Sequence, residues 1–195
     1  MRSFGIENIF SEDDYLYLKN YIYNNINTAS DFIYTEYYGR WWNIVELDDR
    51  INTFIMEAVR KHLGDNLVIA FNQCIKYQKI GDCIPKLEPH TDHFYNDYTL
   101  DITIDTTLNW PLEIEGQYLS CSNNSGIFLD GNNENHSRPE YPGSDNDYMV
   151  MLYVNLVDQN SDILNKINAM KGLSENTRKM LLSRMIPRQH KKEAE

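Results

Sequence analysis

The chain has 195 residues, of which 42% are hydrophobic and 24% charged, which is the ordinary composition of a globular protein large enough for one sizeable core. Its formal net charge of -11 argues against nucleic acid or an anionic membrane as the main partner, because both attract basic surfaces. No apolar run approaches membrane-spanning length and the three cysteines form no paired framework, so we expect a soluble, cytoplasmic protein.

Two helices are predicted in the N-terminal third of the chain. The first spans about 12–25, where Ser11 can act as the N-cap, acidic residues fill the first turn and apolar residues recur at helical spacing. The second begins after Asp48 or Asp49 and ends at Gly64, with its apolar side chains on one face.

The rest of the chain up to residue 158 reads as strands separated by turns. Extended segments are expected at 4–10, 32–45, 66–78, 98–107, 109–120 with a turn at Gly116, 127–129 and 148–155. Beyond residue 158 the pattern becomes helical again. We expect two short helices within 159–187 and a charged tail over 188–195.

The strand expected at 98–107 alternates between apolar and polar residues. One side carries Leu100, Ile102 and Ile104, and the other carries Thr99, Asp101, Thr103 and Asp105. Such alternation is typical of a strand with one face in the core and one in water. We therefore expect the polar side to be solvent-facing.

A metal site is predicted from residues near the middle of the chain. His90 and Asp92 are two residues apart, so on a strand both side chains point to the same face. An imidazole from a neighbouring strand, His136, would complete two histidines and one carboxylate, a set that leaves coordination positions open. A structural zinc site would instead close its fourth position. His93 would face away from His90, and we expect it at the rim.

The order of these and other residues resembles the Fe(II)/2-oxoglutarate-dependent dioxygenases, particularly the prolyl-hydroxylase-like branch. The resemblance covers roughly residues 66–158 and rests on Tyr77, Gly81, His90 with Asp92, Trp110-Pro111-Leu112, Gly126, His136 to Pro139 and Tyr153-Val154-Asn155. It implies a mainly β fold with flanking helices. In that single domain, residues 66–158 would form a double-stranded β-helix, or jelly-roll barrel. Residues 1–65 would brace it with N-terminal helices, and C-terminal helices would follow.

The resemblance also implies the cofactors and the reaction. Fe(II) would be held by His90, Asp92 and His136, with 2-oxoglutarate as co-substrate and O2 as oxidant. A C–H bond of a small molecule, an amino acid or a peptide side chain would be hydroxylated, with release of succinate and CO2. Asp92 favours hydroxylation, because in the related halogenases a small residue replaces this carboxylate.

One departure from the family pattern concerns the 2-oxoglutarate anchor. Many relatives hold the far carboxylate with a basic residue on the strand after the distal histidine, but here the segment 148–155 contains none. Arg138, two residues after His136, is the expected anchor, with Tyr77 as a second contact. The alternatives are a surface role for Arg138, or an anchor at Lys76, whose neighbour Tyr77 would then face the other way.

The substrate is not specified by the sequence. Arg40, Trp41 and Trp42 are candidates for a substrate pocket together with His93, although strand aromatics more often fill the core. Two other functions stay open: a cupin-like metalloenzyme that does not use 2-oxoglutarate, and a non-catalytic jelly-roll binding or structural module. A dimer contact through the C-terminal helices is a further expectation.

Overall fold

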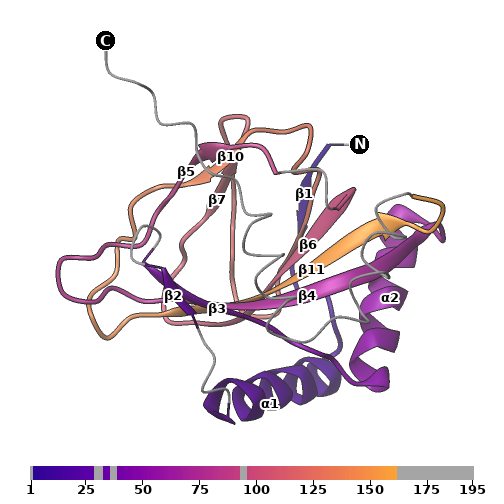
Figure 1. Cartoon of the computed structure of the whole chain (residues 1–195), viewed down its shortest axis with the longest axis horizontal. Helices are drawn as coiled ribbons and strands as arrows, with labels where there is room; N and C mark the ends of the chain where they lie inside the picture. Colours follow the sequence, from indigo (N-terminus) through magenta and orange to yellow (C-terminus); the bar gives the residue numbers. More distant parts are fainter. Residues whose placement is uncertain (1, 29–32, 36–38, 93–95, 162–195) are drawn as a thin grey trace.

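The computed structural model describes residues 2–28, 33–35, 39–92 and 96–161. Within these ranges the chain forms two β-sheets and the helices α1 (Glu12–Thr28) and α2 (Asp49–Leu63) (Figure 1). Neither described helix is long and apolar enough to cross a membrane. The predicted C-terminal helices and tail, from residue 162 onward, lie outside the described ranges.

The larger sheet has seven strands in the order β1-β9-β6-β11-β4-β3-β2. In chain order these are β1 (Phe4–Ile6), β2 (Ile33–Thr35), β3 (Arg40–Ile44), β4 (Leu67–Tyr77), β6 (Tyr98–Thr106), β9 (Gly126–Leu129) and β11 (Met149–Asp158). All their pairings are antiparallel. The aromatic segment expected at 32–45 thus contains two paired strands, β2 and β3.

The smaller sheet has the order β5-β10-β7-β8, again antiparallel. Its strands are β5 (Leu87–His90), β7 (Leu112–Ile114), β8 (Gln117–Leu119) and β10 (His136–Arg138). Apolar residues from both sheets share one buried cluster, so the sheets pack face to face. The predicted turn at Gly116 is confirmed: Glu115 and Gly116 both have positive φ and join β7 to β8.

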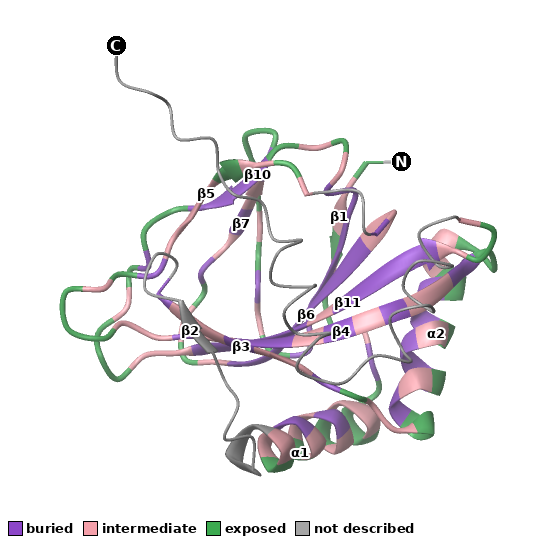
Figure 2. Ribbon diagram, in the orientation of Figure 1, coloured by how far each residue is buried: buried purple, intermediate pink, exposed green. Residues whose placement is uncertain are grey.

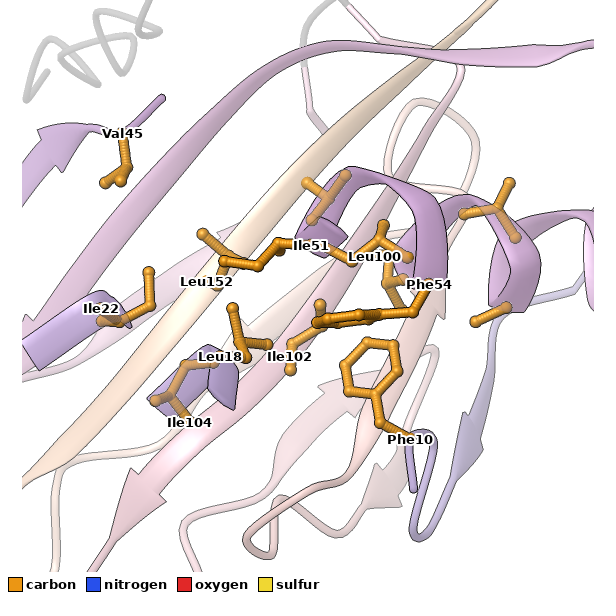
Figure 3. Packing of buried hydrophobic residues seen from close by; sticks show 14 of the residues in the cluster. Phe10, Leu18, Ile22, Val45, Ile51, Phe54, Leu100, Ile102, Ile104 and Leu152 are labelled. Atoms are coloured by element: carbon orange, nitrogen blue, oxygen red, sulfur yellow. The ribbon is translucent and has the colours of Figure 1, made fainter. Parts of the chain in front are cut away.

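Both helices pack against the outer face of the larger sheet, opposite the smaller sheet (Figure 1). Ile51 and Phe54 of α2 and Leu18 of α1 lie against Ile102 of β6 and Leu152 of β11 (Figure 3). Full burial of one such side chain contributes about 1.5–3 kcal/mol. This shared apolar layer therefore holds the two N-terminal helices to the sheet.

The predicted helix starts are confirmed. The Asp14 N–H donates to Ser11 Oγ at 3.2 Å, and the Ile51 N–H donates to Asp48 Oδ1 at 2.8 Å. Gly64, with φ of 92°, follows the end of α2.

The end of α1 was predicted too early. The helix continues to Thr28 rather than stopping near residue 25. Tyr21 and Tyr23 donate to Glu46 O at 2.7 Å and Asp105 Oδ2 at 2.5 Å, so contacts with distant residues hold the last turns in place.

The polar side of β6 does not face water. Thr99, Asp101 and Thr103 are at most 4% exposed, because the second sheet covers them. Figure 2 shows β6, β11 and β4 buried along most of their length. Asp105 departs from this pattern and pairs with Lys19 of α1 at 2.8 Å. The interior between the sheets therefore carries polar groups as well as apolar ones.

Candidate metal centre

Two histidines face each other across the smaller sheet. His90 ends β5, His136 begins β10, and the antiparallel register places them directly opposite one another. Side chains at such opposed positions lie on the same face of a sheet. The centroids of the two imidazole rings are 4.3 Å apart.

Asp92 completes the cluster from a loop, not from the strand on which the sequence placed it. β5 ends at His90, and a hydrogen bond from the Asp92 N–H to Gly131 O, at 2.6 Å, fixes the loop. The Asp92 Oδ1 atom lies 3.8 Å from His90 Nε2 and 3.5 Å from His136 Nε2. The prediction that His90, Asp92 and His136 meet is confirmed, although for a different geometric reason.

The three side chains are arranged so that one metal ion could bind them. One ligand atom from each residue lies within 4.8 Å of the others. Two ligands about 2.1 Å from an ion and at right angles are about 3 Å apart. Closure on a metal therefore brings ligand atoms that are at most 4.8 Å apart closer by up to about 1.8 Å. The imidazole Nδ1 atoms face Glu88 O at 2.8 Å and Glu134 O at 3.1 Å. Donation of Nδ1–H to these carbonyls leaves both Nε2 lone pairs free for the metal.

The loop that precedes His136 is fixed by the N-terminal segment. The Ser3 N–H donates to Glu134 Oε2 at 2.8 Å, and the Asp130 N–H donates to Ser3 Oγ at 2.8 Å. Between these residues, Gly131 leaves room for the carboxylate: a Cβ there would lie 2.7 Å from Asp92 Cγ. This loop therefore positions both Asp92 and His136.

The two imidazoles have opposite electrostatic surroundings. Burial and the neighbouring His136 ring lower the pKa of His90. Burial also lowers the pKa of His136, but the hydrogen bond and charge of Asp92 outweigh it and the net shift is upward. His90 is therefore the more readily neutral of the two, which is the form that binds a metal.

Arg138 is a buried cation, so its predicted surface alternative is wrong. The residue is 2% exposed, and its Nη1 donates to Trp110 O at 2.7 Å. The other contacts of its Nη atoms are the sulfur atoms of Cys121 and Met151, at 3.2 to 3.6 Å. Nε has no hydrogen-bond partner, and no carboxylate among the described residues lies within 4.0 Å of the guanidinium. The interior thus holds a positive charge without a paired anion.

Tyr77 faces this interior with Arg138, and Lys76 does not. The Tyr77 side chain is fully buried in the cluster between the sheets, and its hydroxyl lies 3.0 Å from the Tyr153 hydroxyl. Lys76 lies 5.6 Å from the ring centroid of Trp41 and 5.8 Å from that of Tyr148, which packs against the helix-side core. The alternative anchor at Lys76 is therefore on the wrong face of the sheet.

The four residues proposed from sequence for the substrate are placed differently, and Trp41 lies beside Lys76, whose Nζ is 5.6 Å from its ring centroid. Arg40 donates to the Tyr77 hydroxyl at 3.2 Å and so borders the interior. Trp42 is 5% exposed in the cluster between the sheets, in agreement with a core-filling role. His93 lies outside the described residues.

Sequence reasoning missed Asp101 as a residue of this interior. The sequence analysis placed it only on the polar side of the strand at 98–107, which was expected to face solvent. Its carboxyl is 4% exposed, and its Oδ1 has no hydrogen-bond partner. The sequence feature that could have found it is the alternation of apolar and polar residues in β6. Assigning the polar side of that strand to the barrel interior would have placed Asp101 inside.

Comparisons with known proteins identify solved structures that have a similar fold. No protein-family model and no curated protein sequence matches the chain. The solved structure of SnoN, a non-heme alpha-ketoglutarate-dependent epimerase from nogalamycin biosynthesis, matches with a TM-score of 0.65 and 9% identity, covering 80% of this chain and 78% of that one. A Pseudomonas putida prolyl-4-hydroxylase matches with a TM-score of 0.59 and 9% identity, covering 81% and 93%. The viral collagen prolyl hydroxylase of Paramecium bursaria Chlorella virus-1 matches with a TM-score of 0.54 and 11% identity, covering 80% and 96%.

The chain therefore has the fold of the 2-oxoglutarate-dependent oxygenases, including prolyl hydroxylases, as the sequence resemblance predicted. At these identities the likeness concerns the fold. The function has to be argued from the site.

Proposed function

We propose that this protein is an Fe(II)- and 2-oxoglutarate-dependent oxygenase that hydroxylates a C–H bond and releases succinate and CO2. One observation carries the proposal: the His90, Asp92 and His136 cluster shares its interior with the unpaired, buried guanidinium of Arg138. Solved structures of the same fold hold iron with alpha-ketoglutarate, or nickel with 2-oxoglutarate, which supports this pairing of sites.

His90, Asp92 and His136 would hold the iron. The donor set fits, because two neutral imidazoles and one carboxylate are the ligands typical of a non-heme ferrous site with open positions. The Glu88 and Glu134 carbonyls orient the two rings, and the Asp92 charge partly neutralises the cation. When bound, the iron supplies positions for the co-substrate and O2 and the oxidising power of the reaction.

Arg138, with Tyr77, would hold the far carboxylate of 2-oxoglutarate. A buried cation without an anion is costly, so a site of this kind favours an anionic ligand. The planar guanidinium suits a carboxylate, because it can donate two parallel hydrogen bonds. Trp110, whose ring centroid lies 5.2 Å from the Arg138 Cζ atom, and its apolar neighbours shield this pair from water, which strengthens the interaction.

The substrate would be a small molecule, an amino acid or a peptide side chain. Arg40 and His93 are the candidate substrate contacts. Trp42 would line the interior without contacting the substrate directly, because its side chain is packed in the cluster between the sheets.

The test is succinate release from 2-oxoglutarate by the protein reconstituted with Fe(II), with and without O2. We expect succinate only when iron, 2-oxoglutarate and O2 are all present, and its loss in Asp92→Ala. Asp82→Ala, which removes an exposed aspartate, is the matched control and should keep full turnover.

Two results would contradict the proposal. Metal binding without 2-oxoglutarate binding would favour the cupin-like alternative. Metal content unchanged by Asp92→Ala would favour a non-catalytic module. A third result would narrow it: because SnoN is an epimerase, a substrate that stimulates succinate formation but is recovered without an added hydroxyl group would support 2-oxoglutarate as co-substrate and exclude hydroxylation.

A further inference from the structure

Asp101 lies at the middle of β6, inside the barrel. Its cross-strand neighbours are Tyr153 on β11 and Ile127 on β9, and Ile127 belongs to the cluster between the sheets. The side chain is 4% exposed, yet Oδ1 has no hydrogen-bond partner. A buried polar atom without a partner costs free energy, so a ligand that supplies one is favoured there.

The surroundings of Asp101 connect the two parts of the proposed site. Its carboxyl interacts electrostatically with Arg138, and also with Asp92 and His136 of the metal cluster. Arg138 and His136 are reciprocally influenced by Asp101. Asp101 therefore lies in the same interior as the metal ligands and the guanidinium, where a molecule held by both would be bound.

The protonation state of Asp101 decides whether it attracts or repels such a molecule. An ionised carboxylate is an acceptor only and would repel an oxo acid that carries two negative charges, whereas a carboxylic acid donates one O–H. Burial raises the pKa of Asp101 to about 7, although the Arg138 charge lowers it. The neutral form is therefore accessible near neutral pH in the metal-free protein.

We propose that Asp101, as a neutral carboxylic acid, binds the 2-oxo acid by donating its O–H to an oxygen of that co-substrate. The inference rests on the proposed function and adds a third residue to the Arg138 and Tyr77 contacts. It makes Asp101 a co-substrate-binding residue rather than a counter-ion of Arg138.

The test is calorimetric titration of the Ni(II)-loaded full-length protein with 2-oxoglutarate. Asp101→Asn keeps a donor of similar shape without charge, and its Kd should stay within about threefold of the wild type. Asp101→Leu removes the donor at similar volume, and its Kd should rise at least about tenfold. Thr103→Val, on the same face two residues along β6, is the matched control and should leave Kd unchanged.

Each alternative role of Asp101 predicts a different result. Tighter binding by Asp101→Asn would mean that a carboxylate repels the ligand. Equal weakening in the Asn and Leu variants would mean that the charge is required. An unchanged Kd in Asp101→Leu would mean that there is no contact. Any of these overturns the inference.

Two further measurements keep the outcome interpretable. Ni(II) affinity and thermal unfolding are measured for every variant, and Asp101→Ala replaces the leucine variant if that one does not fold. The Asn result does not depend on the other variants: a change beyond about threefold in either direction refutes the inference. Failure of the wild type to bind 2-oxoglutarate would refute the proposed function itself.

Discussion

Gly131→Ala is the sharpest test of how the metal ligands are positioned. The added methyl group would lie 2.7 Å from Asp92 Cγ and 3.0 Å from Asp92 Cβ, and closer still to Oδ2. Carbon atoms in ordinary contact are about 3.5–4.0 Å apart. The Asp92 carboxylate must therefore move by roughly 1 Å.

The expected loss is large enough to measure. Disturbing the groups that orient metal ligands costs about 10–100-fold in metal affinity, which corresponds to about 1.4–2.7 kcal/mol. Calorimetric titration of the metal-free protein with Ni(II) measures this affinity directly, and circular dichroism reports whether the variant is folded.

Gly5→Ala is the matched control. A Cβ at that position would be 4.0 Å from Ile127 Cγ1, an ordinary contact, so its Ni(II) affinity should equal that of the wild type. A folded Gly131→Ala protein that also binds Ni(II) like the wild type would refute the assignment of Asp92 as a ligand held by this loop.

Three other substitutions address the interior and the N-terminal contact. Arg138→Met should weaken 2-oxoglutarate binding at least about 30-fold in calorimetry without lowering the free energy of unfolding of the ligand-free protein, because an unpaired buried charge is removed. Burial raises the pKa of Asp101 from 3.8 to about 7, so between these pH values the folded state keeps a proton that the unfolded state loses. The contribution of this group to stability is therefore greatest below pH 4 and falls by up to about 4 kcal/mol as the pH rises to 7. Asp101→Asn should lack this part of the decline. Denaturant unfolding at pH 5 and pH 8 measures it, and an equal loss of stability with pH in the wild type and in Asp101→Asn would show that the assignment is wrong. Ser3→Ala should lower Ni(II) affinity several-fold, because it removes the hydrogen bonds of Ser3 Oγ with Glu134 Oε2 and with the Asp130 N–H. An affinity equal to that of the wild type would show that these side-chain contacts do not position the loop.

Local patterns were sufficient for most of the fold. Ser11 and Asp48 have short side chains that cap helices, and both do so. The alternation of Leu100, Ile102 and Ile104 predicted which side of β6 packs against apolar neighbours. These features depend on residues a few positions apart, which is why sequence alone could predict them.

Features that depend on distant residues could not be predicted in the same way. The extension of α1 to Thr28 depends on Tyr23 meeting Asp105, which is 82 residues away. The position of Asp92 depends on the Gly131 carbonyl rather than on strand geometry. The alternation in β6 could not say whether Asp101 faces water or a second sheet, because both surroundings accept polar residues at that spacing.

The strand β10 is only three residues long, yet it carries both His136 and Arg138. Successive strand side chains alternate between faces, so a pairing shifted by one residue would turn the imidazole and the guanidinium outward together. An insertion or deletion that shifts the pairing of β10 by one residue would abolish both sites in a single event.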